Sequence, residues 1–566
     1  MQISTRMTYQ YVLSFLCLLQ CTLPVVGQQS PTDKYWIFFT NKNPTTLSLQ
    51  KDLRKSFPER TIQRRLKNLS SDNLIDNYDL PVMPQYIDRV RSLGIEIMVE
   101  SRWFNAVSAN LSDEQKEIVS KLPFVSSVKV VARAKPNSIT KSLVSSKNSS
   151  AFSNSDYGSS YEQNAIINTP AAHQLGYSGK GILIGMIDTG FNLKHIALRH
   201  VNVVDDSDFV ENDKDVTEDT GVKGSSSHGT YVLSAIAGNA PGKLIGTAFG
   251  ASYLLARTEN DDGIGQKAEE DRWIAALEWL EKEGADIASS SISFFDDFQN
   301  AADNYTLSDL DGKTAMTTLA TNIAFDKGLL VFNSAGNMGT RGSGYLGTPS
   351  DGKKMIAVGA IYGDSTVTTF SSRGPTKDGR KKPDLAALGY HVTVVGIDTS
   401  HYDFLDGTSL STPLVAGLAA LVLEANPSWN VKQLYEAIKK TASVSSKPNN
   451  QIGYGIPNAI KTLQYDPSGS SNPFVKNIMS FPNPSRGTVT ISFQSLTTSR
   501  FSIKIYNTLG QFVSSIAENE SANENEIVTR TWRGKNFNGN EVGSGVYFCR
   551  INLGGKSATE KIVIIK

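Results

Sequence analysis

The sequence predicts an α/β protein: a parallel sheet with helices on both faces, preceded by a small α+β unit and followed by an all-β sandwich. Between residues 157 and 464, short apolar runs such as 181–187 alternate with amphipathic stretches such as 271–282. This alternation is typical of βα units, whose strands pair in parallel. Beyond residue 473 the pattern changes to short alternating strands separated by Gly and Asn, which indicates a separate β sandwich.

The length and charge of the chain limit the classes of function. Its 566 residues exceed the roughly 250 to 300 residues at which a single core stops growing, so several domains are expected. Lys and Arg number 56 against 55 Asp and Glu, and this balance argues against nucleic acid as a partner. The hydrophobic content of 39% fits a globular protein rather than a fibrous or disordered one.

The first 27 residues have the features of a cleaved signal peptide, so we expect export. Arg6 supplies a positive start, residues 11–19 are apolar, and Val25 and Gly27 offer small side chains for cleavage. A membrane anchor is the alternative, but the apolar run falls well short of the about 20 residues that span hydrocarbon. Removing the leader leaves Cys549 as the one remaining cysteine, so no internal disulfide is expected.

The segment 28–156 divides into a folded unit and a linker. Short apolar strands such as 35–39 and a charged helical stretch at 112–121 predict the small α+β unit. Residues 137–156 are dominated by Ser and Asn, have little to bury, and should be open to proteolysis. We interpret them as a processing linker; an ordinary interdomain tether is the alternative.

Four polar residues of the central domain stand at positions suited to catalysis. Asp188 follows the buried strand at 182–187, at the carboxyl edge where catalytic groups of parallel sheets collect. His228 precedes an apolar stretch that predicts a packed helix, and Ser409 lies at a Gly-rich helix start whose N–H groups and dipole favour an oxyanion. Asn337 follows a Gly on a turn after a strand. Taken alone, each of these residues is more often a cap, a turn former or a structural side chain than a catalytic group.

These residues occur in the order Asp, His, Asn, Ser, and the chain resembles the subtilisin family over roughly residues 157–463. The resemblance implies a subtilisin-like domain over residues 157–465 that hydrolyses peptide bonds of proteins. The motifs that carry it are GMIDTG at 185–190, HGT at 228–230, AGN at 335–337 and GTSLSTP at 407–413, supported by FSSRGP at 370–375 and KPD at 382–384.

The resemblance also implies a catalytic triad. Ser409 would attack the peptide carbonyl while His228 accepts its proton, and Asp188 would fix the tautomer of His228 and stabilise its imidazolium. The acyl-enzyme would then be hydrolysed by water, with Asn337 and the backbone N–H of Ser409 as the oxyanion hole. The implied substrate-binding residues are Ser291, Ile292 and Ser293, by β-pairing with an extended peptide, and Ala335 and Gly336, as a wall of the first specificity pocket.

The chain departs from the family pattern at three positions. Tyr231 stands where many members have a second His, Ser293 where a Gly is common, and Leu388 where a Pro is usual. None of these changes removes a catalytic group, so the expected effect is on specificity. Family members often bind calcium, so a structural calcium ion is possible in this chain. No cofactor and no metal ligand are assigned, because no compact Asp and Asn loop matches a ligand pattern.

The two flanking regions also resemble known domains. The unit at residues 34–131 is placed and sized like the propeptide of secreted subtilases, so we interpret residues 28–156 as a propeptide with its processing linker. This implies a zymogen held by its own intramolecular inhibitor; a retained binding domain is the alternative. Residues 474–566, after a turn-rich linker at 466–473, are similar to the sorting domain of the type IX secretion route of certain Gram-negative bacteria. That similarity implies passage through the type IX machinery to the medium or the outer surface; a stabilising or carbohydrate-binding sandwich is the alternative. It rests on FPNP at 481–484, IYN at 505–507, LG at 509–510, WRGK at 532–535, GSGVY at 543–547 and the end 561–566.

Two rival functions stay open. The first is a catalytically inactive subtilase-fold binding module, against which the complete set of Asp188, His228, Ser409 and Asn337 argues. The second is a surface adhesin that acts through its C-terminal β domain, which binding of residues 473–566 to glycans or host proteins would favour.

Overall fold

The structure is a computed structural model of the chain. It describes residues 33–42, 47–131, 133–134, 140–141, 155–217, 227–259, 268–295, 304–396, 398–465, 467, 475–508 and 510–566. The predicted signal peptide, most of the predicted linker at 137–156 and nearly all of that at 466–473 lie outside these residues.

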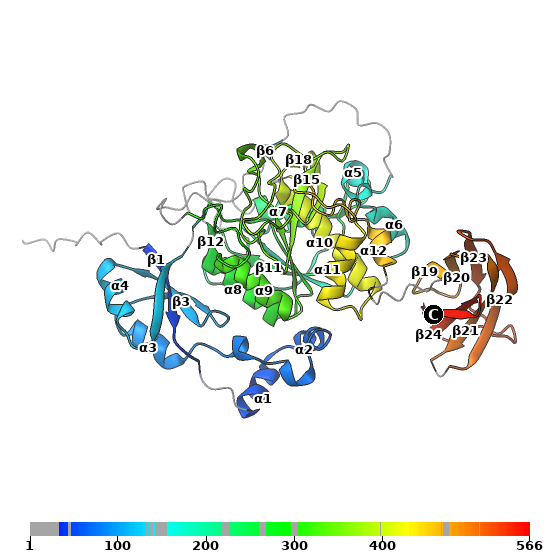
Figure 1. Cartoon of the computed structure of the whole chain (residues 1–566), viewed down its shortest axis with the longest axis horizontal. Helices are drawn as coiled ribbons and strands as arrows, with labels where there is room; N and C mark the ends of the chain where they lie inside the picture. Colours follow the sequence, from blue (N-terminus) through cyan, green and yellow to red (C-terminus); the bar gives the residue numbers. More distant parts are fainter. Residues whose placement is uncertain are drawn as a thin grey trace, which may run out of the picture.

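The central domain is built on a seven-stranded sheet (Figure 1). Every neighbouring pair of its strands is parallel, as predicted. The carboxyl ends of the strands therefore meet at one edge of the sheet. In spatial order the strands are β16 (Leu385–Leu388), β15 (Ile356–Ile361), β14 (Leu330–Ser334), β13 (Ile287–Ser290), β7 (Leu183–Asp188), β11 (Ser252–Arg257) and β8 (Asn202–Asp208).

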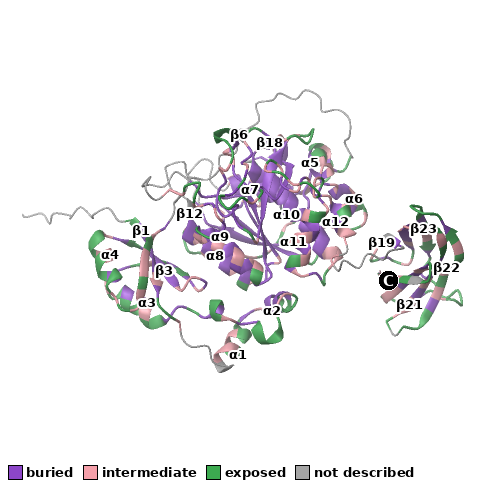
Figure 2. Ribbon diagram, viewed as in Figure 1, coloured by how far each residue is buried: buried purple, intermediate pink, exposed green. Residues whose placement is uncertain are grey.

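Helices cover both faces of this sheet because its strands are apolar on both sides. Alternate residues of β7 enter two separate cores: Ile184 and Met186 pack into one, and Leu183 and Ile187 into the other. In Figure 2 the central strands and the helix α10 are buried. The first core is covered by α6 (Thr169–Gln174), α7 (Ser227–Ala237), α10 (Thr408–Ala425), α11 (Val431–Lys440) and α12 (Ala459–Leu463), and the second by α8 (Glu270–Lys282) and α9 (Met316–Asp326).

The N-terminal unit has the predicted α+β composition. Its antiparallel sheet has the order β2 (Ile97–Ser101), β3 (Ala106–Leu111), β1 (Asp33–Phe39), β4 (Val125–Val130), and α3 (Pro84–Arg91) and α4 (Asp113–Ser120) pack on it. Between β1 and α3 the chain forms α1 (Leu47–Ser56), α2 (Glu59–Leu66), η1 (Ser71–Asn73) and η2 (Asn77–Asp79). We call residues 47–83 the helical arm. Its helices lie beside the central domain (Figure 1), and Val82 near its end joins the core of the sheet.

Two short strands tie the region after β4 to the central domain. β5 (Arg133–Ala134) pairs with β12 (Ala268–Glu269), and β6 (Thr140–Lys141) pairs with β18 (Tyr402–Asp406), both antiparallel. These strands could not be predicted from the sequence, because two-residue pairings leave no periodic pattern in it. The smaller elements of the central domain are η3 (Gly158–Ser160), α5 (Tyr161–Ala165), β9 (Asn239–Ala240), β10 (Leu244–Ile245), η5 (Gly339–Arg341) and β17 (Val392–Val395).

The C-terminal domain is the predicted β sandwich. Side chains from its two sheets share one core, which includes Ile491, Ile503 and the free, buried Cys549. One sheet has the order β19 (Val475–Phe481), β20 (Val489–Ser495), β23 (Ile527–Trp532), and the other β22 (Phe512–Ala522), β21 (Ser499–Asn507), β24 (Gly545–Leu553), β25 (Lys556–Ile564).

Candidate active site

Asp188 and His228 are joined by a hydrogen bond at the carboxyl edge of the sheet. Asp188 is the last residue of β7, His228 is the second residue of α7, and both are buried. The Nδ1 atom of His228 lies 2.6 Å from Oδ1 of Asp188. Because an ionised carboxylate can only accept, Nδ1 carries the proton and Nε2 is the basic nitrogen of the neutral ring. The same Oδ1 accepts from the N–H of Thr189 at 2.8 Å, which holds the carboxylate in place.

Gly229 allows α7 to approach β7 closely enough for this bond. A Cβ at position 229 would lie 2.2 Å from the backbone oxygen of Gly190 and 3.0 Å from Cβ of Asp188. Backbone atoms cannot move aside as a flexible side chain can, so only glycine fits. The Gly that follows His228 in the sequence motif therefore has a packing role.

Ser409 lies at the N-terminus of α10, as its second residue, and is fully buried. Its Oγ donates to the backbone oxygen of Ser291 at 3.4 Å, and Oγ of Ser291 donates to the backbone oxygen of Ser409 at 2.8 Å. The helix directs its positive dipole end and its first N–H groups toward Ser409. Among the described helices α10 alone is long and apolar enough to span a membrane, but 89% of it is buried in the protein. It is a core helix that fixes the position of Ser409.

Asn337 is held by the residue that precedes Ser409. Its Oδ1 accepts from the N–H of Thr408 at 3.1 Å and from Oγ1 of Thr408 at 2.9 Å. Because Oδ1 faces Thr408, the Nδ2 donors on the other side of the amide are directed away from it. The turn that carries Asn337 is supported by Ser372, whose N–H donates to the backbone oxygen of Gly336 at 2.9 Å and whose Oγ accepts from the N–H of Met338 at 3.1 Å.

The two predicted substrate-binding segments lie beside these residues and are buried. Ser291, Ile292 and Ser293 follow β13 directly, and the backbone oxygen of Ile292 accepts from Nδ2 of Asn333 at 2.9 Å. The N–H of Ala335 donates to the backbone oxygen of Val358, and Gly336 has φ +104°, which favours glycine. Their predicted contact with substrate stays a prediction.

The site therefore consists of two bonded groups at one edge of the sheet. One is Asp188 with His228, and the other is Ser409 with Ser291 and Asn337 next to Thr408. The helices that carry them, α7 and α10, pack against each other. Among the described residues there is no group of three or more His, Cys, Asp or Glu that could hold a metal ion.

Three contributors carried no role in the sequence analysis. Thr408 orients Asn337, Ser372 supports its turn, and Gly229 admits the Asp188–His228 contact. A Thr between Gly and Ser at a helix start is a usable signal for Thr408, since such hydroxyls commonly bond near helix ends. The role of Ser372 depends on a partner 36 residues away, which no local pattern reveals.

Comparisons with known proteins match three parts of the chain. Residues 179–455 match the Subtilase family, residues 34–149 the Peptidase S8 propeptide domain of Bacteroidota, and residues 479–565 the Secretion system C-terminal sorting domain.

Several subtilisins are similar to the central part. Subtilisin E of Bacillus subtilis (strain 168) is 31% identical over 283 residues, which cover 49% of this chain and 64% of that protein. Subtilisin of Bacillus pumilus is 30% identical over 283 residues, 49% of this chain and 89% of that protein. Subtilisin Savinase of Lederbergia lenta is 30% identical over 298 residues, 52% of this chain and 94% of that protein. The match thus spans less than two thirds of the length of Subtilisin E and nearly all of the other two.

Proposed function

Because the chain belongs to the subtilase family, we propose that it is a serine endopeptidase, made as a zymogen, with Asp188, His228 and Ser409 as its catalytic residues. The observation that carries this proposal is the 2.6 Å bond between Asp188 and His228 at the sheet edge where Ser409 lies in the first turn of α10. The family matches at residues 34–149, 179–455 and 479–565 support three successive domains. The boundaries at residues 27, 156, 465 and 473 stay predictions.

In the proposed mechanism each group has a defined role, and His228 acts as both base and acid. Nε2 of His228 takes the proton of Ser409 as Oγ attacks the peptide carbonyl, and the resulting imidazolium is stabilised by Asp188. Nδ2 of Asn337 and the N–H of Ser409 donate to the oxyanion, and His228 then protonates the leaving amine. Water activated by the same His228 then hydrolyses the acyl-enzyme, which completes hydrolysis of the peptide bond.

The oxyanion role of Asn337 is testable with an isosteric change. Asn337→Asp keeps an oxygen that accepts from Thr408 but loses the Nδ2 donors, so we expect kcat to fall by about 10²- to 10³-fold or more with little change in KM. Steady-state kinetics on a short peptide substrate measure both constants. An unchanged kcat would remove Asn337 from the oxyanion hole.

The region after β4 is proposed to be the first substrate of the site. Two pairings support this proposal. The β5–β12 pairing holds Arg133–Ala134 against the central domain, and the β6–β18 pairing holds Thr140–Lys141 against it. β18 ends at Asp406, three residues before Ser409. α8 follows β12 directly, and Nε1 of Trp273 in its first turn donates to Oγ of Ser290, the residue before Ser291. The two described ends, Ala134 opposite Ala268 and Thr140 opposite Asp406, therefore lie beside elements that lead to Ser290 and Ser409.

We expect the maturation cut to fall between Ala134 and Thr140. Residues 135–139, between these two, lie outside the described residues. Intact mass and N-terminal sequencing of the processed protein will then give a first residue between 135 and 140. A sole cut near residue 157, at the end of the predicted linker, would contradict this assignment.

Export and the remaining partners follow from the flanking domains. The sorting-domain match indicates a secreted or cell-surface protein. We propose that the N-terminal signal peptide and the type IX machinery carry it there, that its propeptide inhibits it until removed, and that its substrates are proteins. No cofactor is proposed for the chemistry; a structural calcium requirement is to be tested by thermal unfolding with and without EGTA.

The decisive test of the proposed function is labelling with a fluorophosphonate probe, followed by intact mass spectrometry. We expect one adduct per chain, mapped to Ser409. A folded, fully processed chain that takes up no probe would instead favour the inactive binding module.

A further inference from the structure

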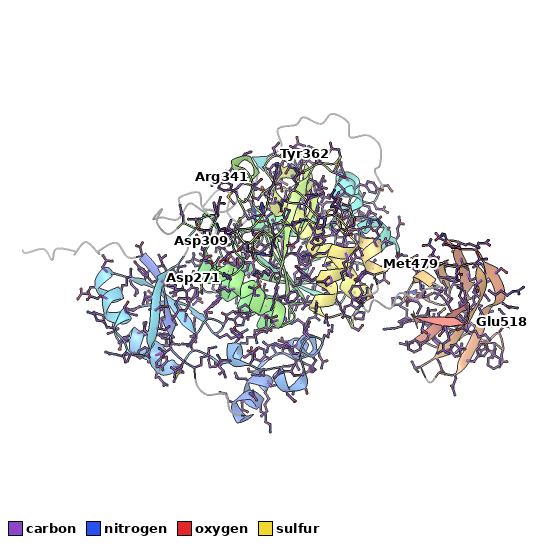
Figure 3. All side chains as sticks on the ribbon, viewed as in Figure 1. Asp271, Asp309, Arg341, Tyr362, Met479 and Glu518 are labelled. Atoms are coloured by element: carbon purple, nitrogen blue, oxygen red, sulfur yellow. The ribbon has the colours of Figure 1, made fainter. Side chains whose placement is uncertain are left out.

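The face of α8 that meets the propeptide carries three carboxylates. Asp271, Glu278 and Glu281 recur at a spacing that puts them on one side of a helix. Asp271, labelled in Figure 3, pairs with Lys34 at 2.7 Å, and Glu278 accepts from the N–H of Arg102 at 3.1 Å. These two carboxylates hold the sheet of the propeptide.

Glu281 holds the helical arm. Its carboxylate pairs with Arg64 and accepts from Arg65 at 2.9 Å (Nε) and 2.8 Å (Nη2), and Arg102 is a third cation, at 2.9 Å. Glu281 and Arg65 have no exposed side-chain surface. Burial alone would raise the pKa of Glu281, but the three cations hold that pKa well below its usual range. The carboxylate is therefore ionised in the complex.

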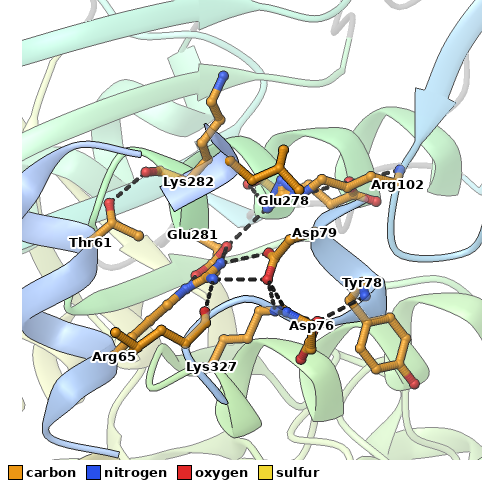
Figure 4. Close-up of polar contacts among 12 residues, drawn as sticks. Thr61, Arg65, Asp76, Tyr78, Asp79, Arg102, Glu278, Glu281, Lys282 and Lys327 are labelled. Atoms are coloured by element: carbon orange, nitrogen blue, oxygen red, sulfur yellow. Dashed lines mark hydrogen bonds and ion pairs between the residues drawn. The ribbon is translucent and has the colours of Figure 1, made fainter. Parts of the chain in front are cut away.

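Arg65 is fully used as a donor, as Figure 4 illustrates. Besides its two bonds to Glu281, it donates to Asp79 at 3.0 and 2.9 Å and to the backbone oxygen of Leu74 at 2.7 Å. A guanidinium has five N–H groups, and these contacts employ all of them. Asp79 in turn pairs at 3.0 Å with Lys327, which follows α9 in the catalytic domain. The arm and the catalytic domain thus share one buried ionic network.

This network lies away from the active site. α8 starts near Ser290 at the carboxyl edge of the sheet, and Glu281 lies eleven residues after its first residue, about 16 Å further along the helix axis. Arg64 and Thr61 of the arm also donate to backbone oxygens just beyond, at Ala285 and Lys282, at 2.6 Å each. Substrate that enters near Ser409 does not compete with these contacts.

We infer that the helical arm is a second anchor of the propeptide, centred on Glu281, that keeps the propeptide bound to the catalytic domain after the connecting peptide has been cut. This inference rests on the proposed function, because it concerns the state after self-processing. The catalytic domain binds the excised propeptide through Glu281, which recognises Arg64 and Arg65 of α2. Breaking one side of a buried ion pair leaves the other charge uncompensated, so the network makes the interface selective for this arm.

The test uses the full chain after self-processing. Native mass spectrometry follows how much cleaved propeptide stays bound to the catalytic domain as the protein is diluted. Two variants each leave one partner intact: Glu281→Gln has an unchanged propeptide, and Arg65→Gln has an unchanged mature domain. We expect each to weaken retention of the propeptide by about 100-fold or more and to bring forward the onset of peptidase activity. The matched controls are Glu283→Gln, two residues further along, and Lys55→Gln, an exposed lysine of α1; both should retain the propeptide like the unmodified protein.

Three outcomes are distinguishable. Retention within threefold of the unmodified protein in either variant overturns the inference. If the mature domain from Arg65→Gln has an unchanged kcat but no longer retains the propeptide, the inference is supported and misfolding of that domain is excluded. If the unmodified chain neither cleaves itself nor takes up the fluorophosphonate probe, the proposed function fails. Retention of the propeptide is then measured after an added protease has cut the chain within residues 142–154. Loss of this retention in the two variants still supports the anchor.

Discussion

Ser409→Ala will reduce kcat toward a peptide substrate by about 10⁴- to 10⁶-fold, because the acyl-enzyme cannot form without Oγ. The variant should also stay full length, since the region between Ala134 and Thr140 is the proposed first substrate. Its fold should be unaffected, because Oγ of Ser409 makes a long 3.4 Å bond to Ser291 whereas the packing of α10 is apolar. Peptidase assays, intact mass and thermal unfolding check these three points.

Ser411→Ala is the matched control. Ser411 lies two residues further along α10, is equally buried, and donates to the backbone oxygen of Thr408 at 2.9 Å. Losing this bond costs stability of about 1 kcal/mol, but kcat and self-processing should persist. Retained hydrolysis in Ser409→Ala, or an equal loss in both variants, would refute Ser409 as the nucleophile.

Much of the fold could be predicted because buried parallel strands are apolar runs. The runs at 181–187 and 329–333 correspond to β7 and β14, and the amphipathic stretch at 431–440 is α11. β8 was not predicted, since its sequence NVVDDSD is mostly polar, as suits a strand at the edge of the sheet. Its pairing with β11 depends on residues 50 positions away, which local periodicity cannot indicate.

The site was predictable for a different reason. Asp188, His228, Asn337 and Ser409 lie in short motifs whose Gly and Thr neighbours have structural tasks, as Gly229 and Thr408 show. The arm offers no such motif. Arg65 and Glu281 are 216 residues apart, and charged residues in amphipathic helices normally face solvent, so the sequence does not distinguish them from ordinary surface charges. Only the tertiary arrangement makes them partners.

Asp188→Asn is expected to lower kcat by about 10⁴-fold while KM changes little. The amide nitrogen of Asn would donate where the carboxylate accepts, so Nδ1 of His228 becomes an acceptor and Nε2 carries the proton. A protonated Nε2 cannot receive the proton of Ser409, and the imidazolium loses its counter-charge. Steady-state kinetics measure kcat and KM. The rate of fluorophosphonate labelling measures the loss of reactivity of Ser409.

Asp208→Asn distinguishes this effect from loss of a buried charge in general. Asp208 ends β8 at the same edge of the sheet, is buried, and pairs with Arg257 at 2.5 Å. Breaking that pair should lower the free energy of unfolding by about 3 kcal/mol, yet kcat of the folded protein should stay within about threefold. If Asp188→Asn lost no more than tenfold in kcat, or if Asp208→Asn lost as much, Asp188 would be a structural carboxylate. If instead the loss is confined to Asp188→Asn, the bond between Asp188 and His228 sets the tautomer on which the attack by Ser409 depends.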